Sequence, residues 1–249
     1  MIIYVFNDTF EGFLTAVYHS YYTDKKPNKI IPNSCYEEEY NLVDEFINIT
    51  TDETKSKKVN TALKREFSKQ SLIHIYYCSL SSDKDIFTLL YKFIVLGFKL
   101  KKELDSHLHN ETVIQVLKTS RKVSLESHRF LGFIRFKNME EDFYYSAIEP
   151  DHNILPLIGA HFASRFKNQN FIIHDIKRKT AIFHSQGQWI IRDLNSLENQ
   201  SLLSCEEQGI YSDLWKTYFN STTIKERTNS KLQKRMMPSR YWNHLTEIE

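Results

Sequence analysis

The stretch from Phe171 to Arg192, which reads FIIHDIKRKTAIFHSQGQWIIR, decides the fold of the second half of the chain. Three short runs rich in β-branched and aromatic residues alternate with two polar segments of the kind found in turns. We expect these turns at Lys177–Lys179 and at Gln186–Gly187. The runs therefore predict an antiparallel meander of three strands. The expected strands are Phe171–His174, Thr180–His184 and Gln188–Arg192.

The segments on either side of this meander carry both strand and helix patterns. Phe133–Phe136 and Phe143–Ile148 flank a polar turn, which predicts a β-hairpin. Ile154–Phe166 has helical spacing, with Pro156 in its first turn, where proline is tolerated. Leu203–Phe219 returns to helical spacing. The second half is thus expected to contain a sheet with one helix inserted, followed by more helix.

The first half of the chain has a mainly helical pattern. Ile2–Phe6 is a short β-branched and aromatic run that predicts one strand. Beyond it, apolar residues recur three and four positions apart, which is typical of amphipathic helices. We expect residues 24–32 to form a loop. The expected helices follow Asp8 or Thr9, follow the capping box Thr50-Thr51-Asp52-Glu53, run through Leu72–Tyr76, run from Ser82 to a C-cap at Gly97, and run from Val113 to a point before Gly132.

These patterns together predict an α+β fold in a single domain, 1–249. Its first part, 1–131, is expected to be mainly helical. It would pack with an antiparallel β part, 132–200, that contains one helix. A basic helical tail, 201–249, would follow.

The composition of the 249-residue chain excludes several classes of protein. Hydrophobic residues make up 41% and charged residues 26%, which excludes a disordered or collagen-like chain. No apolar run approaches the roughly 20 residues of a membrane-spanning helix, and the first residues lack the pattern of a secretory signal. The three cysteines lie far apart and predict neither a disulfide framework nor a thiolate metal site. We therefore expect a cytoplasmic globular protein with no membrane partner.

The net charge of +2 hides an uneven distribution. Glu37–Glu53 holds seven acids and no base, whereas Lys92–Lys137 holds ten bases against four acids, and Lys225–His244 six bases against one acid. In the last segment the rings of Tyr241 and Trp242 adjoin cations, a combination suited to stacking on unpaired bases while binding phosphates. This pattern indicates an anionic partner. Two alternatives stay open, namely a solvated helix face and rings that anchor the segment to the core.

A second basic site is expected on the long helix that precedes Gly132. At 3.6 residues per turn, Arg121, His128 and Arg129 share roughly one face, and Lys122 adjoins them. Such a ridge would bind phosphates if it is exposed. The alternative is ordinary ion pairing with neighbouring acids such as Glu126.

The densest group of acid–base residues is Glu149-Pro150-Asp151-His152, at an expected junction between a strand and a helix. Two carboxylates and an imidazole can bind a divalent metal or relay protons, although the pattern names no particular metal or cofactor. The alternative is a helix cap beside an exposed imidazole. His128, His174 and Asp175 could join the group, but neighbours on a strand point to opposite faces, so His174 and Asp175 cannot both enter one pocket. The chain contains no HExxH, GxSxG, P-loop or GxGxxG motif.

Several further motifs follow one another in a fixed order along the chain. The most specific is Ile148-Glu149-Pro150-Asp151-His152-Asn153-x-Leu155-Pro156-Leu157. The others are Tyr4 with Asp8-x-Phe10-Glu11-Gly12, Leu96-Gly97-Phe98-Lys99, Arg121-Lys122-Val123, Glu126-x-His128-Arg129, Gly132-Phe133-x-Arg135-Phe136, His161-Phe162, Ile173-His174-Asp175, Leu214-Trp215-Lys216-x-Tyr218-Phe219, Ile224-x-Glu226-Arg227-x-Asn229, Leu232-Gln233 and Met237-Pro238-x-Arg240-Tyr241-Trp242-x-His244-Leu245. This series resembles, nearly from end to end, a family of uncharacterised bacterial proteins associated with DNA metabolism and DNA repair. The chain departs from the family pattern at Phe171, Thr228 and Ser230, where Trp, a basic residue and Pro are expected.

The resemblance implies a role in DNA repair or DNA modification. Members of that family look like companions of a radical-SAM protein, and the domain can be fused to a uracil-DNA-glycosylase-like domain. The resemblance therefore implies DNA, a radical-SAM protein and a uracil-DNA-glycosylase-like domain as partners. Because iron–sulfur clusters are held mainly by cysteine thiolates, and this chain lacks paired cysteines, any cluster would belong to the partner.

Three functional hypotheses follow. The first is a DNA-repair or DNA-modification accessory protein that binds DNA and acts with a radical-SAM partner. Its DNA-binding residues would be Arg121, Lys122, Arg129, Arg227, Lys234, Arg235, Arg240, Tyr241 and Trp242. The second is a hydrolytic or metal-dependent enzyme acting on a nucleotide or nucleic acid. Its catalytic residues would be Glu149, Asp151, His152, His128, His174 and Asp175. The third is a structural protein-interaction module.

Overall fold

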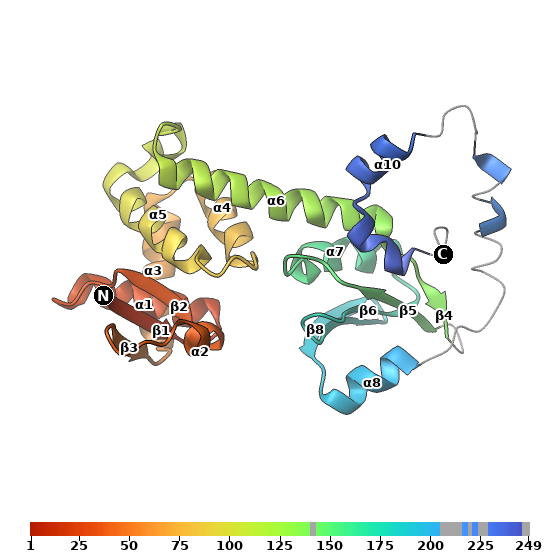
Figure 1. Cartoon of the computed structure of the whole chain (residues 1–249), viewed down its shortest axis with the longest axis horizontal. Helices are drawn as coiled ribbons and strands as arrows, with labels where there is room; N and C mark the ends of the chain where they lie inside the picture. The colour runs from red at the N-terminus through yellow and green to blue at the C-terminus, as the bar shows by residue number, and fades with distance from the viewer. Residues whose placement is uncertain (140–142, 205–215, 219–220, 224–228, 246–249) are drawn as a thin grey trace. The chain divides into compact units, whose positions relative to one another are not determined.

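The computed structural model describes residues 1–139, 143–204, 216–218, 221–223 and 229–245. The chain divides into two compact units, Met1–Ser124 (unit 1) and Leu125–Glu249 (unit 2). Helix α6, Glu111–Phe133, contributes residues to both units (Figure 1). Within the described part of the chain, no helix combines the length and the apolar character that crossing a membrane requires.

Unit 1 is built on a small sheet in which all strands are parallel. Strand β1, Ile2–Phe6, lies between β2, Lys29–Pro32, and β3, Glu45–Ile49. Because parallel neighbours need a crossover connection, helix α1, Phe10–Tyr22, joins β1 to β2. The side chain of Thr9 caps this helix by accepting from the backbone N–H of Gly12, which confirms the expected helix start.

Strand β1 was predictable, but its two partners were not. Strand β2 lies in the segment 24–32 that the sequence predicts to be a loop, and that prediction is wrong for its last four residues. The two central residues of β2 are both buried, so the strand lacks the alternation that reveals a half-exposed strand. Strand β3 lies in the acid-rich segment Glu37–Glu53, where charge obscures the short apolar pattern.

The other elements of unit 1 are helical, and the apolar spacing predicts the three longest of those named next. They are α2, Tyr36–Glu39; α3, Glu53–Glu66; α4, Lys69–Ser79; α5, Ile86–Leu100; and the 3-10 helices η1, Asn33–Cys35, and η2, Lys101–Ser106. The predicted C-cap at Gly97 is wrong, because α5 continues to Leu100. A Cβ on Gly97 would lie 2.3 Å from the Phe67 ring, so glycine serves close packing there. Helix α3 follows the predicted capping box Thr50–Glu53, but its cap is Asp52 and not Thr50, because the Asp52 carboxylate accepts from the backbone N–H groups of Thr54 and Lys55.

Unit 2 contains a mixed five-stranded sheet. Its strands, in spatial order, are β4, Lys137–Asn138; β5, Phe143–Ile148; β6, Asn170–Asp175; β7, Thr180–Ser185; and β8, Gln188–Asp193. Strands β6, β7 and β8 form the expected antiparallel meander. Strand β5 pairs with β6 in parallel, so the sheet is not purely antiparallel as predicted. Helix α7, Leu155–Arg165, makes the crossover, with Pro156 in its first turn.

The predicted hairpin is wrong in its first strand. Helix α6 continues to Phe133, and only Lys137–Asn138 pairs with β5. Phe130 in the last turn of α6 and Ile134 directly after the helix are both buried and belong to the same core. The apolar run 133–136 therefore belongs to a helix end and the turn after it.

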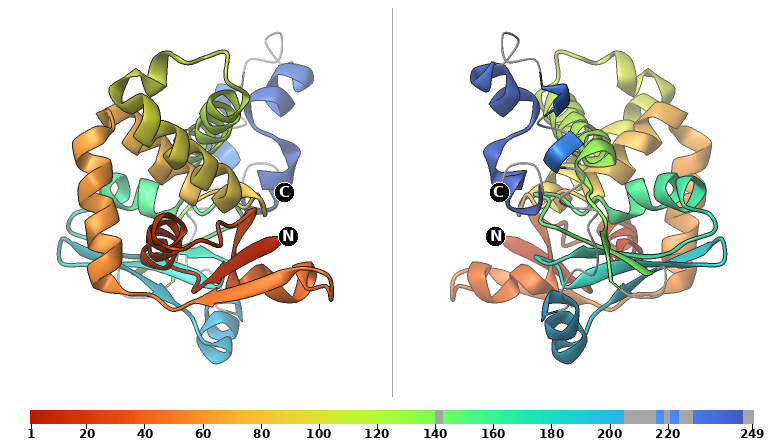
Figure 2. Two further views of the ribbon diagram at one scale, coloured as in Figure 1. Left: turned by 90° about the vertical axis from the view of Figure 1, so that its left-hand side faces the viewer. Right: turned by 90° about the vertical axis from the view of Figure 1, so that its right-hand side faces the viewer.

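Both faces of the five-stranded sheet are covered. One face packs on α7, on the end of α6 and on the tail, a name used here for residues 229–245, with α10, Ser230–Met236, and the 3-10 helix η4, Ser239–His244. Helix α8, Ser196–Ser204, covers the other face. Figure 2 (right) shows α8 and the tail on opposite sides of this sheet. The predicted helix 203–219 falls mostly outside the described residues. Helices with mixed sheets confirm the α+β class.

Candidate functional site

A buried carboxylate on α6 organises the turn that carries the predicted acid–base residues. Glu126 is only 4% exposed. Its Oε1 accepts from the backbone N–H of Asp151 at 2.7 Å, and its Oε2 accepts from that of His152 at 2.8 Å. A buried charge is costly unless it is hydrogen-bonded, and these two N–H groups supply that need. Glu126 therefore fixes the backbone of the 149–152 turn.

The tail reaches the same carboxylate through Tyr241. The Tyr241 hydroxyl donates to Oε1 of Glu126 at 2.5 Å, and its ring packs edge-on against Phe130 with centroids 4.9 Å apart. The side chain is 4% exposed. Burial, and then the Glu126 carboxylate, raise the pKa of Tyr241 well above its usual value. Tyr241 thus anchors the tail, and its ring faces are covered in this arrangement.

Arg240 and His244 of the tail contact the two carboxylates of the turn. Nη2 of Arg240 lies 2.7 Å from Oδ2 of Asp151 and also donates to the Tyr241 hydroxyl at 2.9 Å. Nε2 of His244 lies 3.2 Å from Oε2 of Glu149, an ion pair when the imidazole is protonated. These four side chains are partly open to solvent. Two of the three carboxylates that the sequence proposes as catalytic, Glu149 and Asp151, are therefore engaged by the tail.

Asp175 supports the turn from the end of β6. Its carboxylate is fully buried and accepts from Nη1 of Arg178 at 2.8 Å. Burial raises the pKa of Asp175, against the lowering effect of Arg178. The same guanidinium donates to the carbonyl oxygens of Pro150, at 3.1 Å, and Asp151, at 2.5 Å. Arg178 therefore ties the β6–β7 turn to the 149–152 turn.

His174 lies on the opposite face of the sheet. Its Nδ1 is 2.9 Å from the Tyr145 hydroxyl, and its Nε2 is 2.9 Å from Oδ1 of Asn199 on α8. Burial lowers the pKa of His174, although the bond to Asn199 opposes that effect. The expectation that His174 and Asp175 face opposite ways is confirmed by these contacts. The structure thus does not gather the six proposed catalytic residues into one site.

The remaining acid–base candidates are His128 and His152. His128 is exposed on α6, and His152 is half-buried beside its bonded backbone. Among the described residues, no group of three or more His, Cys, Asp and Glu side chains is placed to hold a metal ion.

The proposed DNA-binding residues, apart from Arg227, lie in the tail and on α6. Lys234 and Arg235 are exposed on α10, and neither forms an ion pair with a described residue. Trp242 is half-buried, with its indole N–H donating to the Met237 carbonyl at 2.9 Å. Arg227 lies outside the described residues. The tail thus combines a buried anchor with exposed cations.

The other proposed DNA-binding residues, Arg121, Lys122 and Arg129, lie on α6. Arg121 and Lys122 are exposed in unit 1, and Arg129 is half-buried in unit 2. The suggested ion pair with Glu126 does not form, because that carboxylate points inward to the backbone of the 149–152 turn. None of the three cations pairs with an acid among the residues that the structure describes.

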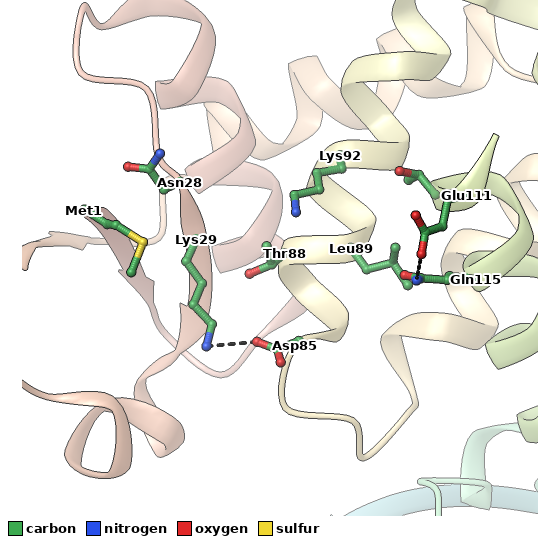
Figure 3. Close-up of a pocket in the computed structure, with 10 residues that line it drawn as sticks. Met1, Asn28, Lys29, Asp85, Thr88, Leu89, Lys92, Glu111 and Gln115 are labelled. Carbon is green, nitrogen blue, oxygen red and sulfur yellow. Dashed lines mark hydrogen bonds and ion pairs between the residues drawn. The ribbon is translucent and has the colours of Figure 1, made fainter.

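Unit 1 contains a separate hollow of about 510 Å³ with charges of both signs. Figure 3 shows Lys29 bonded to Asp85, and Glu111 bonded to Gln115, around it, with Lys92 nearby. Since acids neutralise part of its positive charge, this hollow has no clear preference for an anion. It contains none of the residues that the sequence proposes for function.

Sequence reasoning missed two residues that organise the site. Glu126 entered it as a partner for surface cations and as a member of one motif of the family resemblance, and Arg178 only as a turn residue. For Glu126 a signal existed, because it occupies the buried stripe of α6 with Val123 and Phe130, three and four positions away. A charge within an apolar stripe indicates a buried partner. Arg178 had no comparable signal.

Comparison with known proteins identifies a family whose function is unknown. No curated protein matches the chain. Residues 84–247 match a family described as a domain of unknown function, DUF4130. The matched part holds the whole network around Glu126, from α6 to His244, and leaves out β1 to α4. Since the match spans well over half of the sequence, the chain belongs to the DUF4130 family.

Proposed function

We propose that this protein is a DNA-binding accessory protein of DNA repair or modification, with the tail as its principal DNA contact. The proposal rests on the observation that the basic residues of the tail fall into two sets, one that contacts acids of the protein and one that does not. Arg240 and His244 bind the acids of the 149–152 turn, whereas Lys231, Lys234 and Arg235 stay exposed without an acid among the described residues.

The Tyr241 anchor gives these cations a fixed support. Its ring packs against both Phe130 and Phe133 at the end of α6, so the tail is held against the helix that carries Arg129. The contact between the tail and α6 within unit 2 is thus made by aromatic rings. Phosphate contacts from such cations position a protein on DNA without selecting a sequence.

The engaged acids favour binding over hydrolysis. A general base must reach the proton that it abstracts, and a metal needs free ligand atoms. Asp151 is bound by Arg240, Glu149 by His244 and Asp175 by Arg178. Their contacts support a role for the acids in holding the tail.

The family resemblance supplies the rest of the proposal. It supports a radical-SAM protein as the functional companion, with a uracil-DNA-glycosylase-like domain as a further associate. Redox chemistry would belong to the companion, and this chain would deliver or hold the DNA. The proposal places the protein in the cytoplasm, with DNA as its ligand.

Fluorescence anisotropy with labelled DNA tests this function. We expect affinity for single-stranded and duplex oligonucleotides to fall steeply with salt, because phosphate binding releases counterions. The double variant Lys234→Gln/Arg235→Gln should bind more weakly. It should reduce the slope of log K against log salt by about 1.4 on single strands and about 1.8 on duplexes, for two lost phosphate contacts.

The matched control is Arg165→Gln/Lys167→Gln, which removes two exposed cations at the end of α7. It should change the salt slope by much less than the tail variant. Binding that is flat in salt, or equal loss in both double variants, would show that the tail is not the DNA contact. Binding of neither DNA form at low salt would overturn the function itself.

A further inference from the structure

A groove rich in aromatic rings lies on unit 1, away from any residue proposed above for function. It has a volume of about 460 Å³ and lies between α1, α3 and α5. Tyr18, Tyr21 and Tyr22 of α1 line it with Phe98 of α5 and Lys58 of α3. On α1 these tyrosines are spaced three and four positions apart, which places them on one side of the helix.

The rings are unusually exposed for their size. Tyr22 is 73% exposed and Tyr21 49% exposed. Tyr18 and Tyr22 stack with centroids 4.4 Å apart and planes 26° apart, while Tyr21 meets Phe98 edge-on at 5.8 Å. Contacts among the rings hold them in place, while the outer surfaces of Tyr21 and Tyr22 stay open to solvent. An exposed aromatic cluster of this kind marks a binding surface.

The charge at the groove is positive. Nζ of Lys58 lies 5.9 Å from the centroid of the Tyr18 ring. On the same helix, Lys55 pairs with Asp52 and Lys57 pairs with Glu53. Lys58, by contrast, has no acidic partner among the described residues. The rings favour a flat ligand. The cation beside them favours a ligand that carries a negative charge over one that carries a positive charge.

We propose that this groove binds an unpaired base of single-stranded DNA, with the base stacked on Tyr22 and the neighbouring phosphate held by Lys58. The inference rests on the proposed function and adds a second contact to it, in a different unit. Stacking on aromatic side chains tolerates any base, because every base has a π-face, and a lysine beside the rings holds the backbone. A paired base cannot enter, so duplex DNA should not use the groove.

Substitution of the exposed ring tests the stacking. With a labelled oligothymidine of about 20 nucleotides, we expect Tyr22→Ala to weaken binding about 10-fold, and Tyr22→Phe to bind like the wild type because the ring remains. Lys58→Gln should weaken binding and reduce the salt slope by about 0.7. None of the three variants should change the affinity for a blunt-ended duplex.

Tyr40→Ala is the matched control, since Tyr40 is a 54% exposed tyrosine of unit 1 outside the groove. It should leave binding unchanged. Thermal melting should show that all variants are folded, which the exposure of Tyr22 and Lys58 favours. If Tyr22→Ala binds oligothymidine as well as the wild type, or loses duplex affinity equally, the groove is not a base-binding site.

Photocrosslinking separates this inference from the proposed function. An oligothymidine carrying 4-thiothymidine should crosslink to the peptide that contains residues 18–22, and Tyr22→Ala should abolish that product. One outcome would overturn the groove and leave the proposed function standing. In it, crosslinks are confined to the tail, Lys234→Gln/Arg235→Gln binds oligothymidine more weakly, and Tyr22→Ala binds it like the wild type. The reverse pattern would support the groove and overturn the tail as the principal contact.

Discussion

The hydroxyl of Tyr241 donates a hydrogen bond to the carboxylate of Glu126, across a separation of 115 residues. The same carboxylate accepts the backbone N–H groups of Asp151 and His152. One buried acid therefore joins helix α6, the 149–152 turn and the tail. Loss of this acid should loosen both the turn and the tail.

Glu126→Ala should strongly destabilise the fold. It leaves two backbone N–H groups without an acceptor and leaves the Tyr241 hydroxyl with only its longer bond, 3.3 Å, to Oδ2 of Asp151. Each unsatisfied buried group costs about 1–3 kcal/mol. We expect the free energy of unfolding, measured by urea denaturation, to fall by about 3–5 kcal/mol. Glu149→Gln breaks a solvent-exposed pair and should cost at most about 1 kcal/mol. Equal losses in the two variants would contradict the role of Glu126.

Tyr241 should contribute more through its ring than through its hydroxyl. Tyr241→Phe loses hydrogen bonding and should cost about 1–2 kcal/mol, whereas Tyr241→Ala also empties a packed site and should cost about 3–5 kcal/mol. Limited trypsin digestion provides a second measurement. Cleavage after Lys234 and Arg235 should be faster in Tyr241→Ala, because the tail loses its anchor. An unchanged digestion rate would show that the tail is held elsewhere.

His174 should make the protein less stable in mild acid. Burial lowers the pKa of His174 below 6.5, so the unfolded chain takes up a proton before the folded protein does. The stability that depends on neutral His174 is present above about pH 6.5. It is lost as the pH falls through the pKa of His174 in the folded protein. We expect urea unfolding to show a drop in stability between about pH 7.5 and pH 5.5.

The variant His174→Gln isolates this effect. It keeps a polar group between Tyr145 and Asn199 but cannot titrate, so the drop should become smaller. His19 and His74, whose pKa values burial also lowers, remain in both proteins. Asp175, with a raised pKa, acts in the opposite direction in both. An identical pH profile for variant and wild type would exclude His174 as a source.

Alanine substitution at two glycines within helices should change the free energy of unfolding in opposite directions. A Cβ on Gly97 would lie 2.3 Å from the Phe67 ring, whereas a Cβ on Gly132 meets nothing within 4 Å. Gly97→Ala should therefore lower the free energy of unfolding by about 1–3 kcal/mol through overpacking. Gly132→Ala should raise it by up to about 1 kcal/mol through helix propensity. Thermal or urea unfolding distinguishes the two, and stabilisation by Gly97→Ala would contradict the close packing.

Periodicity predicts those elements whose faces differ in polarity. The helices of unit 1 and the meander β6–β8 carry that signal, and both are found. Strands β2 and β3 lack it, because β2 is short and buried and β3 lies among acids. The pairing of β5 with β6 is parallel, a direction that alternation alone does not reveal.

The site was predictable in its members more than in its arrangement. The 149–152 turn, Arg240 and Tyr241 were all named, but as parts of separate catalytic and binding sites. Their contacts depend on the distance between α6 and the tail in the folded chain, which no local pattern encodes. The inward direction of Glu126 was the one local hint, since the residue lies on a buried stripe.

The Tyr241 anchor also bears on biosynthesis. During translation, Glu126 and the 149–152 turn emerge well before the phenol that completes their network. Until residues 240–245 have been made, the carboxylate lacks one of its three donors and the aromatic pocket beside Phe130 stays empty. Unit 2 should therefore reach its final packing only after residues 240–245 have been made.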